Sequence, residues 1–256
     1  GRIERHRGTE LWSSGYDIAS DLEGLGIVAP SPFAKEPASP RPTRVGLGFS
    51  PRGLDEIAVE SGPARLRLQL GEGADGHLQL QRGIARFDGQ PAVLPQGAGL
   101  HLTGDWPEFD LGEWLALGSS EGPGMLSKWL GPTDVRVEKA RIFGFEFSAV
   151  DAALRADPGS LEINVSGPTA QGVVTVPGDL DGGLPIRFRM ERLVLQPVTA
   201  PGADHPSQLD PRDLPALEFD IADFRWRQRH FGRLVGNVVK DPAGLRLDGL
   251  KATTPH

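Results

Sequence analysis

Apolar and polar residues alternate one by one along most of the chain from Thr43 onward. Residues 64–70 and 186–190 are clear examples, because an apolar residue occupies every second position. A period of two places one set of side chains on each face of a β-strand. Short glycine-containing turns separate the runs, which favours antiparallel hairpins over crossover connections. The pattern therefore predicts a mainly β chain whose strands are apolar on one face and polar on the other.

One hairpin module occurs twice. Asp-Pro-Gly-Ser at 157–160 precedes an alternating run at 161–165, and Asp-Pro-Ala-Gly at 241–244 precedes a run at 245–249. In such a turn proline fixes φ, glycine takes the position with positive φ, and the aspartate side chain caps the local backbone. A repeated one-sided module predicts an extended, quasi-repeating sheet rather than a catalytic pocket.

The N-terminal part follows a different pattern. Residues 11–29 are predicted to form a strand and a turn, and prolines cluster within residues 30–42, where a sheet ladder cannot form. We therefore expect an N-terminal strand and Pro-rich connector over residues 1–42. A repeated β region is expected over residues 43–256 and is expected to continue past the last residue.

Residues near 110–130 interrupt the alternation. Leu111 and Trp114 have helical spacing behind Asp110, a residue type that caps helix N-termini. A second short helix is predicted over residues 125–130, after a Pro-Gly pair. The pattern thus predicts one or two short helices in an otherwise β chain.

Composition narrows the function classes. The net charge is −7, and the 27 basic residues are scattered singly, which argues against a nucleic-acid groove. Residues 224–231 mix arginines with aromatics, as single-strand nucleic-acid platforms do. We interpret them instead as a strand with Phe224 and Trp226 facing inward, followed by a turn. The absence of cysteine excludes disulfides and zinc–thiolate sites.

Motifs that could carry chemistry are weak. Residues 71–76 match the dinucleotide-binding fingerprint, but a strand rather than a helix is predicted after them, so the glycines are interpreted as turn residues. Residues 179–183 lack the further ligands of a calcium loop. No two of the six histidines have metal-ligand spacing. We therefore expect no enzyme activity, no metal and no cofactor.

Five segments together resemble a known family. They are residues 20–25 with the Pro-Ser-Pro-Phe-Ala-Lys stretch that follows, the hairpin at 135–147, and the strands and turns at 214–226, 231–234 and 244–250. They are similar to YhdP-type proteins, members of the bacterial AsmA-like group. The resemblance covers most of the chain.

The resemblance implies a fold and a function. Such proteins are similar to bridge-like lipid transfer proteins, in which a long, curled antiparallel sheet forms an open apolar groove. It implies a periplasmic protein that is attached to the inner membrane by an N-terminal helix and moves phospholipid towards the outer membrane. The chain begins at Gly1 and no run reaches the roughly 18 apolar residues needed to cross a bilayer, so we expect the anchor outside this sequence. Phospholipid and other envelope proteins are the expected partners, and no catalytic residue is implied.

Strand parity predicts which side chains would line the groove. Moving an acyl chain into water costs about 0.8 kcal/mol per methylene, or roughly 12 kcal/mol for a sixteen-carbon tail. An apolar sheet face would remove most of that cost, whereas a closed β domain with a structural or protein-binding role would need the same alternation. The predicted lining residues are Leu66, Leu68, Leu78, Leu80, Leu100, Leu102, Ile163, Ile186, Phe188, Phe219, Ile221 and Leu247.

Overall fold

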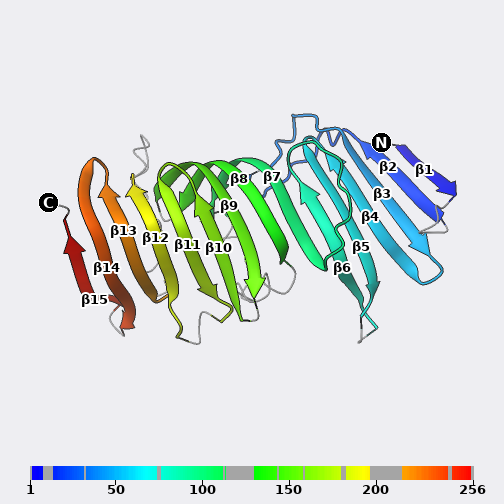
Figure 1. Cartoon of the computed structure of the whole chain (residues 1–256). Helices are drawn as coiled ribbons and strands as arrows, with labels where there is room; N and C mark the ends of the chain where they lie inside the picture. Colours follow the sequence, from blue (N-terminus) through cyan, green and yellow to red (C-terminus); the bar gives the residue numbers. More distant parts are fainter. Residues whose placement is uncertain are drawn as a thin grey trace. The chain divides into compact units, whose positions relative to one another are not determined.

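The computed structural model describes residues 2–7, 14–31, 33–73, 76–111, 113, 130–142, 144–157, 159–179, 183–196, 215–241 and 244–254. The chain divides into two compact units. Unit 1 contains residues 1–105 and 129–135, and unit 2 contains residues 106–128 and 136–256. Each unit is built almost wholly from β-strands (Figure 1).

Fifteen strands are defined. They are β1 (Arg2–Arg7), β2 (Ser14–Ser20), β3 (Thr43–Ser50), β4 (Gly53–Ser61), β5 (Ala64–Glu72), β6 (Leu78–Arg86), β7 (Gly99–Asp110), β8 (Leu130–Ile142), β9 (Phe145–Asp157), β10 (Ser160–Ser166), β11 (Ala170–Pro177), β12 (Ile186–Leu195), β13 (Leu217–Trp226), β14 (Arg229–Asp241) and β15 (Gly244–Thr253). The prediction of a mainly β chain is confirmed.

Strand order follows chain order from β1 to β15, and the two end strands are not neighbours, so the described sheet is open. A second sheet packed against the first is absent from the described residues, which excludes the closed sandwich for that part of the chain. The described ladders are antiparallel apart from β6–β7 and β12–β13, which are parallel. Side chains alternate between the two faces in the same way in parallel and antiparallel ladders, so the sequence pattern alone does not distinguish the two kinds of pairing.

Both predicted Asp-Pro hairpins form. Asp157 faces Ser160 where β9 turns into β10, and Asp241 faces Gly244 where β14 turns into β15. Gly159 has a φ of 86°, a conformation that side chains other than glycine rarely adopt. Each of these two strand pairs is therefore in register up to the residues that flank its turn.

Residues before Thr43 also contribute to the sheet, because β2 pairs with β3 along its whole length. The Pro-rich stretch leaves the sheet after β2 and returns to β3. It is held together by an isolated bridge between Ile27 and Lys35, and the Phe33 ring packs edge-on against Phe87 at 5.6 Å. The buried Lys35 ammonium donates to the Leu25 and Glu36 carbonyl oxygens at 2.8 and 3.0 Å, so its burial is compensated.

The predicted first helix begins where expected. Leu111 and Glu113 are helical, and the Asp110 carboxylate accepts a hydrogen bond from the Glu113 amide at 3.3 Å, as an N-cap does. Residues 114–129 lie outside the described residues, and they contain nearly all of the second predicted helix. Leu130, its last residue, belongs to β8.

The packing is that of a thin layer rather than a globular core. Among the described residues, no large side chain is less than 2 % exposed. In unit 2, Figure 1 shows that strands β9 to β14 bend along their length. The open sheet thus leaves side chains on both faces partly in contact with solvent.

Candidate functional site: an open apolar face

In unit 1, hydrogen-bonded register aligns apolar side chains into rows that cross β1 to β7. Directly opposed residues share a face of the sheet. The first row is Ile3, Ile18, Val45, Val59, Leu66, Ala85 and Leu102. The second row is Tyr16, Leu47, Ile57, Leu68, Gly83 and Leu100.

In unit 2, the same kind of rows cross β9 to β15. The first is Leu154, Ile163, Val174, Phe188, Phe219 and Gly236. The second is Ala152, Val165, Gly172, Met190, Ile221, Leu234 and Ala252. A third row ends in Ile186, Leu217, Val238 and Leu247. We call this surface, in each unit, the apolar face.

All twelve predicted lining residues have a place on the apolar face of their unit. Six belong to the unit 1 rows or their extension, since Leu80 faces Leu70 and Leu78 faces Glu72. The other six belong to the unit 2 rows. The structure brings each set of six together on one face.

β-Bulges maintain this face where simple parity would lose it. The β5–β6 ladder shifts register after Gln69, so that Leu78 and Leu80 share a face with Gly83 and Ala85 although their parity differs. An inserted residue resets the alternation without disrupting the rest of the ladder. Similar shifts occur after Gln171 in β11 and after Ile221 in β13. Leu78, Leu80 and Phe224 therefore remain on the apolar face beyond these shifts.

Several lining residues are absent from the predicted set, among them Val59 in unit 1 and Val174 in unit 2. Val59 lies in an alternating run that carries the same signal as β5. In β11 the signal is ambiguous, because Val173, Val174 and Val176 are all apolar and only register places Val173 on the opposite face. The hydrogen-bonded register therefore shows which face each valine lies on, and the alternation of apolar residues does not.

The apolar face is only partly covered. Most of the predicted residues are half-buried, whereas Leu78 is 55 % and Leu247 is 50 % exposed. Ile221 is the most enclosed at 4 %. A large contiguous apolar surface in contact with water usually marks a binding site. The face is thus available to an apolar ligand without opening a closed core.

The opposite face is polar and held by cross-strand ion pairs. In unit 1, Arg67 bonds Glu56 at 2.6 Å. In unit 2, Arg187 bonds Glu218 at 3.2 Å and Arg233 bonds Asp220 at 2.7 Å. The two unit 2 pairs border a hollow of about 530 Å³ over β12 to β14. The hydrogen bond from Arg233 lowers the pKa of Asp220 below its usual value.

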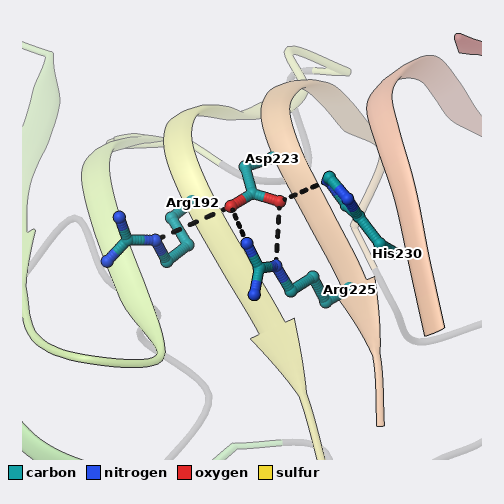
Figure 2. A network of polar contacts seen from close by, with 4 residues as sticks. All are labelled: Arg192, Asp223, Arg225 and His230. Atoms are coloured by element: carbon teal, nitrogen blue, oxygen red, sulfur yellow. Dashed lines mark hydrogen bonds and ion pairs between the residues drawn. The ribbon is translucent and has the colours of Figure 1, made fainter. Parts of the chain in front are cut away.

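A denser polar network lies near the end of β13 (Figure 2). The Asp223 carboxylate accepts two hydrogen bonds from Arg225 at 3.0 and 3.1 Å. His230 Nε2 lies 2.9 Å from the same carboxylate and Arg192 Nε lies 3.8 Å away. The hydrogen bonds from Arg225 are the main reason that the pKa of Asp223 is lowered. One carboxylate therefore ties together β12, β13 and β14.

Two weak motifs of the sequence have structural roles. The next element after the glycine-rich residues 71–76 is β6, so a strand follows them as predicted. Phe224 and Trp226 lie on the apolar face, opposite Leu193 and Leu195, which confirms the strand interpretation of that segment. In the part of the chain that the structure describes, no cluster of three potential metal ligands occurs. The described residues also contain no helix long and apolar enough to span a bilayer.

Comparison with known proteins gives one clear match. The family model described as YhdP protein matches residues 7–256, which is nearly the whole chain. No curated protein and no solved structure matches the chain significantly.

Proposed function

This chain belongs to the YhdP family, and from that premise we propose that it is a segment of a periplasm-spanning lipid transfer protein. The acyl chains of phospholipids lie along the apolar face and move along it between the inner and outer membranes. The segment belongs to the bacterial envelope and is attached to the inner membrane through a part of the protein outside this sequence. Lipid is bound and moved, and no covalent bond is made or broken.

The observation that supports this proposal most strongly is the series of partly exposed apolar rows in each unit. Leaving such a surface in water is costly, at about 25 cal/mol for each Å² of apolar area. An acyl chain laid on the rows would shield both the protein and its own methylenes, each worth about 0.8 kcal/mol. Hydrocarbon is therefore a ligand whose chemistry suits this face.

Two adjacent residues of β11 offer a matched test. Val174 lies on the apolar face between Ile163 and Phe188, whereas Thr175 lies on the polar face between Glu162 and Arg187. Valine and threonine have nearly the same shape, so Val174→Asp and Thr175→Asp introduce the same charge on opposite faces. We expect purified wild-type protein and Thr175→Asp to retain phospholipid in organic extracts analysed by mass spectrometry. Val174→Asp should lose most of the phospholipid, because an acyl chain laid on the carboxylate would remove its hydration at a high cost in free energy.

Folding is checked in parallel by circular dichroism and thermal melting. Because Val174 is partly exposed, Val174→Asp should keep its β signature. Wild-type protein that folds but carries no phospholipid, even after incubation with phospholipid vesicles, would contradict the proposal. Equal lipid content in the two variants would contradict it as well.

A further inference from the structure

The tip of the β13–β14 hairpin, residues 224–231, combines cations with exposed aromatic rings. Arg227 and Gln228 form the turn between the two strands. Trp226 is 38 % and Phe231 is 36 % exposed, although both are large apolar side chains. We call residues 224–231 the arginine tip.

The charges of the arginine tip are only partly neutralised. Asp223 is already shared among Arg192, Arg225 and His230 (Figure 2). Arg227 and Arg229 are exposed, and no carboxylate among the described residues forms an ion pair with either of them. Exposed guanidinium groups without an internal acid are suited to bind a phosphate oxygen, because their planar donor geometry matches it. The cluster stands out in a chain whose net charge is −7.

The arginine tip also ends the apolar face. The outermost row of the β12–β14 ladder is Leu195, Trp226 and Arg229. A cation therefore lies beside two apolar side chains at the end of the apolar face. The Trp226 ring packs edge-on against Phe145 at 5.6 Å, which extends the aromatic surface at this end of the face. A phospholipid has the same order of chemistry, with apolar tails followed by a charged phosphodiester.

The backbone holds the tip in one conformation. Arg227 has a φ of 55°, in the left-handed region that favours glycine or asparagine at such a turn. Its amide donates to the Leu195 carbonyl oxygen at 2.9 Å, which fastens the turn to the end of β12. A residue held in an unfavourable conformation is often retained for what its side chain does.

We propose that the arginine tip binds the phosphodiester of an anionic phospholipid whose tails lie on the apolar face of unit 2. This inference rests on the proposed function and adds headgroup selectivity to it. Arg227 and Arg229 contact the phosphate, and Trp226 packs against the first carbons of the tails. A zwitterionic headgroup carries a cation beside its phosphodiester, which offsets the attraction of the arginines, so such lipids are held mainly through their tails.

The test uses short-chain lipids that dissolve as monomers. Binding of dihexanoyl phosphatidylglycerol and dihexanoyl phosphatidylcholine to the whole chain is measured by calorimetry at low ionic strength. The variant is Arg227→Gln/Arg229→Gln, and the control is Arg52→Gln/Arg155→Gln, which removes two exposed arginines elsewhere. Wild type and control should bind the anionic lipid about tenfold more tightly than the zwitterionic one. The variant should lose this preference and keep its affinity for phosphatidylcholine, and added salt should reduce the preference of wild type.

The outcomes separate the two proposals. Equal affinity of wild type for both lipids, or a preference that survives in the variant, overturns the headgroup inference while the lipid function stands. If neither lipid binds, the lipid function fails. Binding of glycerophosphoglycerol, which is the headgroup without tails, is then measured to test the phosphate site by itself. Binding of that compound by wild type but not by the variant would support the phosphate site alone. No binding would overturn both.

Discussion

At the scale of single residues, Asp223 has the most varied partners on the polar face. Its carboxylate contacts basic side chains from three strands, namely Arg192 of β12, Arg225 of β13 and His230 of β14. It thereby joins the parallel pair β12–β13 to β14 at the end where the ladder is irregular. Periodicity places Asp223 on no particular face, because the bulge after Ile221 resets the alternation beside it.

Asp223→Asn should lower stability near neutral pH and have little effect in acid. The pKa of Asp223 is lowered in the folded chain, mainly by the hydrogen bonds from Arg225, so the carboxylate stabilises the fold above its unfolded pKa. That contribution disappears as the pH falls through the lowered folded value. We expect a loss of about 1 kcal/mol at pH 7, discounted for solvent screening.

Urea unfolding of the two proteins at pH 7 and at pH 2.5 measures this difference. The gap between wild type and Asp223→Asn should shrink at the acid end. A gap that is the same at both pH values would mean that the carboxylate charge contributes nothing.

At the scale of strands, the sequence predicted faces better than it predicted partners. Leu66 and Leu68, or Ile186 and Phe188, share a face by periodicity, and this was correct within each strand. The parallel pairings and the bulges could not be predicted from the sequence, because they depend on the backbone register between segments rather than on residue type. Val173 shows the limit most clearly, since it is apolar and still lies on the polar face.

Glycines on the apolar face let neighbouring strands approach. A Cβ at Gly83 would lie 2.6 Å from Leu68 Cδ2, and one at Gly236 would lie 2.8 Å from the Phe219 ring. At Gly172 a Cβ would overlap the Arg189 carbonyl oxygen and lie 2.6 Å from Met190 Cα. Small residues on one face allow a strand to bend toward that face.

Gly172→Ala should therefore destabilise the chain. Gly172 has a φ of 145° and lies opposite the bulge of β12, where Glu191 has no partner in β11, so alanine would add both backbone strain and a clash with β12. We expect a loss of about 2 kcal/mol or more, seen as a lower thermal midpoint. The control is Gly46→Ala in β3, where a Cβ would meet only Asp17 Oδ1 at 3.4 Å and Ala58 Cβ at 3.7 Å. Gly46→Ala should be neutral or slightly stabilising, and an equal loss in both variants would refute the role given to the bulge.

At the scale of the whole molecule, the chain folds without a covering layer over its described strands. The alternating pattern allowed both an open sheet and a closed domain. Strand order decides between them for the described residues, since each strand follows its predecessor in one sheet.

A walk of a photoreactive amino acid along β11 tests the lipid-bearing face most directly. The residue p-benzoylphenylalanine is placed in turn at Val173, Val174, Thr175 and Val176, and lipid adducts are measured by mass spectrometry after irradiation with phospholipid vesicles. Register places positions 174 and 176 on the apolar face and positions 173 and 175 on the polar face. We predict adducts at 174 and 176 only, although residue 173 is itself a valine. Adducts at all four positions, or at none of them, would contradict the account.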